Sequence, residues 1–162
     1  MKTVYCILLC CSCLVSCHSQ TKNKEMKSDL NLSLLFYPSM SKEYDIRYSI
    51  DIINDSLIVK RQDNIYNKEY SGKLTDNQCT EIKKMTSLLT QKYDRSNSDW
   101  VRNGVWGCTL KVDNQVYYED NFFSFVPQSK EMGWLPPPEE IKLLIDYIVS
   151  LSPIEIELYG FS

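Results

Sequence analysis

A strict alternation of apolar and polar side chains between residues 44 and 52 constrains the fold more than any other feature of the chain. The apolar members of this run are Tyr44, Ile46, Tyr48, Ile50 and Ile52, and every residue between them is polar. A period of two with one polar face is typical of a strand whose sheet is covered on one side. Asn54-Asp55-Ser56 interrupts the pattern, and residues 57–60 then predict the returning strand of a hairpin. A weaker third strand is expected near residues 66–71.

An amphipathic helix is predicted to follow this hairpin. Thr75 and Gln78 have the spacing of a capping box, in which two side chains satisfy the first free amides of a helix. Side chains that recur at helical spacing then form one stripe, which we expect to lie on the sheet. Its members are Cys79, Ile82, Thr86 and Leu89, widened by Met85 and Leu88.

The second half of the chain has the same order of elements. Residues 105–112 predict a strand with Trp106, Cys108, Leu110 and Val112 on one face, and residues 116–125 return after a turn at Asp113-Asn114. Residues 136–138 are prolines followed by Glu139-Glu140, an arrangement that favours the start of a helix. The stripe of this helix is Ile141, Leu144, Ile145, Ile148 and Leu151, and a last short strand is expected at residues 154–158.

These elements predict an α+β fold in two layers, with an antiparallel sheet and two amphipathic helices on one face. Strand, turn, strand, loop and helix occur twice, about 60 residues apart, which suggests an internal duplication. Residues 44–162 are long enough for a single α+β domain. Residues 17–43 are expected to form a tether, whose apolar segment 30–37 can dock on the domain as an edge strand.

The N-terminus has the order of an export signal. Lys2 precedes an apolar run between residues 4 and 15, and the chain turns polar after Cys17. This run of about 12 residues is shorter than the roughly 20 that a membrane-spanning helix needs. Its ending, Leu14-Val15-Ser16-Cys17, resembles the lipobox of bacterial lipoproteins. An ordinary cleaved signal also ends in small residues, but it does not need the cysteine.

The resemblance covers only the first 17 residues, and it indicates where the protein is located. It implies that residues 1–16 are a signal peptide and that Cys17 is acylated as the first residue of the mature chain. The protein is then expected to be anchored to a membrane of the bacterial cell envelope, facing either the periplasm or the outside.

Two cysteines remain in the mature chain once the signal is removed and Cys17 carries lipid. These are Cys79 and Cys108, and both lie on predicted apolar faces. Outside the cytoplasm they can form a disulfide. As free thiols they would instead pack as small apolar side chains. Periodicity leaves both alternatives open.

Several classes of function are excluded by residue type. The sole histidine, His18, lies directly after Cys17, so we expect no Ser-His-Asp, Cys-His or histidine-ligated zinc site within the domain. The five glycines form neither a phosphate-binding loop nor a dinucleotide fingerprint, and no cofactor or metal is expected. Without Lys2 the mature chain keeps 17 basic and 21 acidic side chains with no basic cluster, so no nucleic-acid partner is expected.

The adjacent acids Glu119 and Asp120 are candidates for catalysis. A two-residue turn at Asp113-Asn114 places Glu119 opposite Cys108 on the apolar face. One extra loop residue places Asp120 there instead and moves Tyr118 and Phe122 into the core. Either register tends to bury an acid, and buried acids with a raised pKa can transfer protons. A bulge that lets both acids reach water is the alternative.

Two other segments are candidates for binding or modification. Trp134 and Leu135 precede three stiff prolines and, together with Trp100, can form a rigid aromatic surface for a protein, peptide or glycan partner. A lid over the core is the alternative for these side chains. Asp55-Ser56-Leu57 resembles a short sequon that some envelope bacteria O-glycosylate on the hydroxyl residue, here Ser56. An ordinary hairpin turn explains it equally.

The sequence therefore favours a lipid-anchored, non-enzymatic binding module of receptor, inhibitor or immunity type. One alternative is a carboxylate-based envelope hydrolase that acts through Glu119 or Asp120. The other is a structural component of an envelope assembly.

Overall fold

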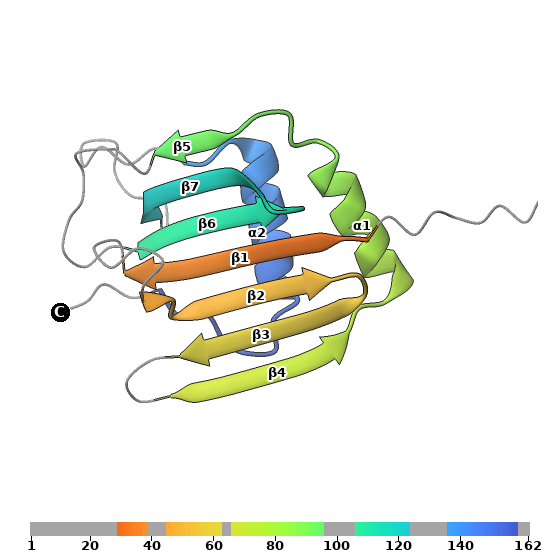
Figure 1. Cartoon of the computed structure of the whole chain (residues 1–162), viewed down its shortest axis with the longest axis vertical. Helices are drawn as coiled ribbons and strands as arrows, with labels where there is room; N and C mark the ends of the chain where they lie inside the picture. The colour runs from red at the N-terminus through yellow and green to blue at the C-terminus, as the bar shows by residue number, and fades with distance from the viewer. Residues whose placement is uncertain (1–28, 39–44, 63–65, 96–105, 124–135, 159–162) are drawn as a thin grey trace, which may run out of the picture.

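The computed structural model describes residues 29–38, 45–62, 66–95, 106–123 and 136–158, and it has an α+β fold (Figure 1). Within these ranges a seven-stranded sheet is accompanied by two helices. The elements in chain order are β1 (Asn31–Pro38), β2 (Tyr48–Ile53), β3 (Ser56–Gln62), β4 (Asn67–Lys73), α1 (Asp76–Thr86), β5 (Tyr93–Arg95), β6 (Trp106–Val112), β7 (Gln115–Phe123) and α2 (Glu139–Ser150).

The sheet is mixed, with the strand order β4-β3-β2-β1-β6-β7-β5. Five of its neighbouring pairs are antiparallel, whereas β5 runs parallel to β7 at one edge. The prediction of a purely antiparallel sheet is therefore wrong at that edge. A strand as short as β5 is too brief to leave a recognisable period in the sequence.

β1 lies in the middle of the sheet, hydrogen-bonded to β2 on one side and to β6 on the other. The prediction that residues 30–37 form an edge segment of a tether is therefore wrong. Leu34, Leu35, Phe36 and Tyr37 are all buried, so this strand is buried on both faces. Such strands are continuously apolar rather than alternating. The sheet thus includes Asn31–Pro38, which precede the boundary expected at residue 44.

The first hairpin and the helix after it follow their local sequence signals. Asn54 takes the left-handed conformation at the turn, with φ of 59°, and Ile53 pairs with Ser56. The capping box of α1 is confirmed, because the Thr75 hydroxyl accepts from the Gln78 amide and the Gln78 side chain accepts from the Thr75 amide. Leu88 was expected to widen the buried stripe, but it follows the helix end and is 58% exposed.

Both helices contribute side chains to one core cluster with the sheet, and α2 lies behind the strands in Figure 1. Ile82 of α1 is buried together with four members of the predicted stripe of α2, namely Ile141, Leu144, Ile145 and Ile148. The fifth member, Leu151, lies at the C-cap of the helix and is partly buried. These side chains pack against one cluster of sheet side chains that includes Leu34, Ile50 and Leu110. No helix among the residues described is long and apolar enough to cross a membrane.

The chain after α2 does not form the predicted last strand. Residues 154–158 have no strand assignment, although Ile154, Ile156 and Leu158 are half-buried against the core. The alternation of apolar and acidic residues therefore reflects packing of an extended segment on the core rather than membership of the sheet. We call residues 152–158 the C-terminal strap.

Candidate functional site

The pairing of β6 with β7 decides where the two candidate acids lie. Asp113 and Asn114 form a two-residue turn, with φ of 50° and 65°. Left-handed conformations at both positions are those that a tight hairpin favours. Leu110 then pairs with Tyr118 and Lys111 with Val116, so Tyr117 is an extra residue in β7. This bulge brings Asp120 opposite Cys108, the register that was expected for one extra loop residue. The prediction that a two-residue turn places Glu119 there is wrong, because the extra residue lies in the strand and not in the loop.

The bulge also moves aromatic rings into the core. Tyr118 is fully buried, as that register predicts. A second irregularity follows, because Trp106 pairs with Phe123, whose side chain is buried. The side chain of Phe122, the other ring expected in the core, lies outside the described residues.

Asp120 is buried to 1% exposure, and both Tyr118 and Arg95 lie beside its carboxylate. Its Oδ2 atom accepts a hydrogen bond of 2.9 Å from the Tyr118 hydroxyl and lies 3.6 Å from Nη1 of Arg95. Arg95 ends β5 and pairs with Asp120 across the parallel ladder. A buried charge without a partner is strongly unfavourable, whereas one that is paired and hydrogen-bonded can be accommodated. The arrangement therefore fastens β5 to β7.

The surroundings of Asp120 keep the neighbouring groups protonated. Burial, and then the charge of Asp120, raise the pKa of the Tyr118 phenol and of the Cys108 thiol. Tyr118 consequently remains a hydrogen-bond donor, and its ring stacks on Tyr93 with centroids 5.6 Å apart. Because a thiolate is the reactive form of cysteine, Cys108 is not activated as a nucleophile.

Glu119 lies on the opposite face of the sheet from Asp120. It pairs with Thr109 in the ladder and is half-buried. Successive residues of a strand point to opposite faces, so the two carboxylates cannot converge on one substrate. The prediction that the register buries an acid is confirmed for Asp120, but the two acids do not form a catalytic pair.

Both remaining cysteines are free thiols, so the interpretation as a disulfide is wrong. The Cys79 sulfur lies 4.0 Å from the carbonyl oxygen of Asn54, whose amide bonds to Leu30, whereas Cys108 pairs with Phe36. Leu30 and Phe36 are about 20 Å apart along an extended chain that rises roughly 3.3 Å per residue. A disulfide needs Cα atoms within about 7 Å.

Ser56 is built into the sheet at the start of β3. It pairs with Ile53 on one side and Lys73 on the other, and it is half-buried. The preceding Asp55 is also engaged, since its carbonyl accepts from Leu74 and its carboxylate lies 3.0 Å from the Lys73 amine. O-glycosylation of Ser56 stays a prediction. The other candidates, Cys17, Trp100, Trp134 and Leu135, lie outside the described residues and also stay predictions.

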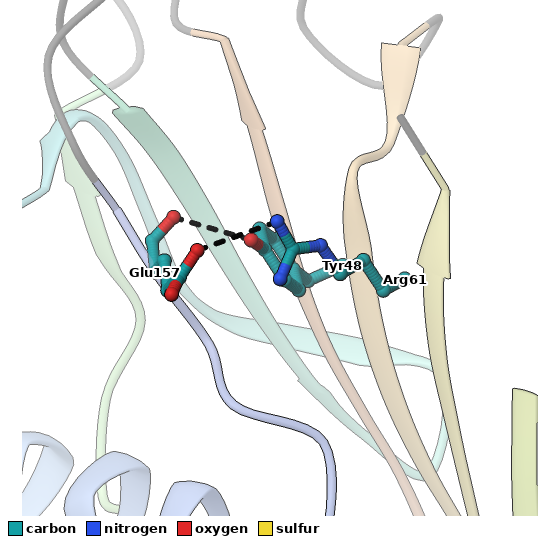
Figure 2. A network of polar contacts seen from close by, with 3 residues as sticks. All are labelled: Tyr48, Arg61 and Glu157. Atoms are coloured by element: carbon teal, nitrogen blue, oxygen red, sulfur yellow. Dashed lines mark hydrogen bonds and ion pairs between the residues drawn. The ribbon is translucent and has the colours of Figure 1, made fainter. Parts of the chain in front are cut away.

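A second group of polar and aromatic side chains is contributed by β2, β3, β4 with the residue before it, and the strap. The guanidinium of Arg61 lies 5.4 Å from the ring centroid of Tyr48 and 4.8 Å from that of Tyr66. Figure 2 shows that Glu157 of the strap contacts Tyr48 and Arg61, and its Oε2 atom lies 3.4 Å from Arg61 Nη2. The Tyr48 hydroxyl donates to the Glu157 carbonyl oxygen at 3.2 Å, and Lys68 lies 5.5 Å from the Tyr66 ring.

We call Tyr48, Arg61, Tyr66, Lys68 and Glu157 the Arg61 cluster. Tyr66 is 46% exposed and Lys68 is also exposed, whereas the Arg61 side chain is only 16% exposed beneath them. An aromatic face next to two cations can bind carboxylates and other π-systems. Sequence reasoning missed this cluster, although a two-residue turn at Asn54-Asp55 would have placed Arg61 opposite Tyr48.

Metal chemistry finds no support in the described part of the chain, where no group of three or more histidine, cysteine or acidic side chains is placed to hold an ion. Comparisons with protein-family models, with curated proteins and with solved structures find no match for this chain.

Proposed function

We propose that the protein is a lipid-anchored binding module of the bacterial cell envelope, of receptor, inhibitor or immunity type. The anchor is inferred from the lipobox and Cys17. The observation that carries the binding role is the Arg61 cluster, which offers an exposed aromatic ring and cations on paired strands.

The composition of this cluster favours recognition of a macromolecule. Tyrosine and arginine are enriched among the residues that carry most of the binding energy of protein interfaces. β3 lies between two paired neighbours, and Arg61 is flanked by two rings, so the group loses little conformational freedom on binding. Because less conformational entropy is lost on binding, a larger share of the contact energy contributes to the affinity.

The alternative of a carboxylate-based hydrolase has weaker support. A proton-transfer role for Asp120 would require access to a substrate, yet this carboxylate is 1% exposed and lies beside Arg95. Glu119, on the other face, has Asp94 of β5 as its ladder partner, but the Asp94 carboxylate lies 3.0 Å from the Lys92 amine and is already engaged in that ion pair. A structural role in an envelope assembly has no specific observation in its favour.

The finer description of the fold belongs to the same proposal. We propose two layers, with α1 and α2 covering one face of the sheet, because side chains of both helices join the same core cluster. Duplication is supported only by the order of elements, since the hairpins β2-β3 and β6-β7 each precede a helix.

Crosslinking in intact cells tests the binding role. We expect wild-type protein to crosslink to a specific partner, and Tyr66→Ala to reduce the yield at least fivefold. Tyr70→Ala is the matched control, because Tyr70 lies on β4 and is 40% exposed but belongs to no part of the Arg61 cluster. Equal yields for the two variants would contradict the assignment of the binding surface.

Metabolic labelling with a palmitate analogue tests the anchor separately. We expect the wild-type chain to be labelled and Cys17→Ala to give an unlabelled species that is unprocessed or soluble. Labelling of the variant as strong as that of the wild type would contradict acylation at Cys17.

A further inference from the structure

Glu157 gives the Arg61 cluster a carboxylate from the same chain. The strap that carries it follows α2 directly and reaches Arg61 on β3 and Tyr48 on β2 (Figure 2). The guanidinium thus already has an acidic occupant in the unbound protein. The chemistry of this occupant indicates what else can bind there.

The contact between Arg61 and Glu157 is loose. Its 3.4 Å separation exceeds the roughly 2.7–2.9 Å of a well-formed bond between a charged nitrogen and a carboxylate. Glu157 is 31% exposed, so water reaches it, and exposed pairs of this kind stabilise a fold by about 1 kcal/mol or less. An incoming carboxylate with better geometry can therefore replace it.

The strap itself is held mainly by side chains. Ser152 bonds to Ile154 within the strap, and residues 153–158 have no strand or helix assignment. The half-buried Ile156 and Leu158 keep the backbone on the core while Glu157 points to the cluster. The side chain of Glu157 can thus leave Arg61 without removal of the apolar residues on either side.

The charges around the cluster favour an acidic ligand. Lys68 is exposed, lies 5.5 Å from the Tyr66 ring centroid and pairs with Arg61 in the ladder, so a second cation is close to Arg61. The strap shows which type of ligand the surface accepts, namely an extended chain that alternates aliphatic and glutamate residues in Ile154-Glu155-Ile156-Glu157-Leu158.

We propose that the Arg61 cluster recognises a carboxylate side chain on an acidic peptide segment of a partner protein, and that Glu157 occupies this site until the partner binds. The inference rests on the proposed function, since it names the chemistry of the partner. It also implies regulation. An internal ligand that occupies a site for part of the time weakens binding of the partner. The apparent affinity for the partner is the intrinsic affinity multiplied by the fraction of molecules in which the site is open.

The test uses a fluorescent peptide copy of residues 154–158 as the probe, with a second peptide in which both glutamates are glutamine. Binding to the full chain is measured by anisotropy at low and at high salt. We expect Glu157→Gln to bind the acidic peptide at least threefold more tightly than wild type, because the internal competitor has lost its charge. Glu155→Gln is the matched control and should bind like wild type, since Glu155 is exposed and lies two residues before Glu157.

Removal of the cation should have the opposite effect. Arg61→Gln in the Glu157→Gln background is expected to weaken the acidic peptide at least tenfold. If that double variant is unfolded in a urea titration, Lys68→Gln replaces it, with an expected loss of about threefold at low salt. The glutamine peptide should bind every variant more weakly than the acidic peptide binds Glu157→Gln.

Two outcomes would overturn the inference. One is that Glu157→Gln binds no more tightly than wild type, and the other is that the glutamine peptide binds as well as the acidic one. The proposed function fails in a different way, through crosslinking in cells that does not depend on Tyr66. Peptide binding without such crosslinking would leave the carboxylate site in place and reject the envelope partner.

Discussion

Replacement of Asp120 by alanine should strongly destabilise the protein. Asp120 is 1% exposed, and the side chain of its partner Arg95 is 13% exposed. Removing one partner of a buried ion pair costs about 3–5 kcal/mol, because it leaves the other charge uncompensated. The Tyr118 hydroxyl also loses its acceptor, and an unsatisfied buried group costs about 1–3 kcal/mol. These contributions overlap, and Arg95 retains slight contact with water, so we expect a total near 3–4 kcal/mol.

Urea unfolding followed by tryptophan fluorescence measures this loss. The matched control is Glu119→Ala, one residue earlier in β7 on the other face, where a half-buried side chain should cost less than about 1 kcal/mol. Asp120→Asn keeps the shape and an acceptor for Tyr118 but removes the charge, and it should lie between the two. Since domains are stable by only about 5–15 kcal/mol, the ranking should be visible in the unfolding midpoints.

A loss below about 1 kcal/mol for Asp120→Ala, or one equal to that of Glu119→Ala, would refute this reasoning. It would mean that Asp120 is not enclosed between Tyr118 and Arg95. The bulge at Tyr117 would then be misplaced, and the register of β7 with it.

Three further predictions concern the thiols, alkaline pH and the tryptophan loop. Cys108 should resist thiol reagents in the native protein because it is fully buried, whereas half-buried Cys79 should react faster, and the mass of the chain should be the same with and without reductant. Burial keeps Cys108 and Tyr118 protonated in the folded state above their ordinary pKa values of 9.0 and 10.0, where the unfolded chain loses these protons, so the free energy of unfolding should fall as pH rises above 9. Urea midpoints between pH 8 and 11 would show this, and Tyr118→Phe should flatten the decline above pH 10. Trp134→Ala should weaken a partner by about 2 kcal/mol or more and cost less than about 1 kcal/mol of stability, whereas a loss of roughly 3–5 kcal/mol in urea would identify Trp134 as a core lid.

Elements with strong local signals were predicted correctly from the sequence. The capping box at Thr75, the buried stripe of α2 and the turn at Asp113-Asn114 depend on residues close together in the chain. The position of β1 was not predictable in this way. Its apolar run suits a strand buried on both faces, but which strands lie beside it is decided by pairing with residues far along the chain.

The candidate sites depended on register, which the hydrophobic pattern determines only in part. Both Glu119 and Asp120 were plausible residues for the core face, and the single extra residue at Tyr117 selected Asp120. That choice also required a cation, which Arg95 provides from a strand that the sequence did not predict. The ion pair with Arg95, which allows Asp120 to be buried, could therefore not be predicted from the sequence of β7 alone.

Arg61 and Asp120 are charged residues at positions that the sheet turns toward the core. In β3 the buried positions Leu57 and Val59 are followed by Arg61, and each pairs with a buried residue of β2. Residues that break the hydrophobic pattern of a fold are expected at functional or strained sites. The two charged residues differ in where the partner of opposite charge comes from. Arg95 pairs with Asp120 inside the strand ladder, whereas Glu157 reaches Arg61 from a strap outside the ladder. A partner within the ladder can be removed only by breaking the sheet, but a partner on the strap can be exchanged, and this difference is why we assign structure to Asp120 and recognition to Arg61.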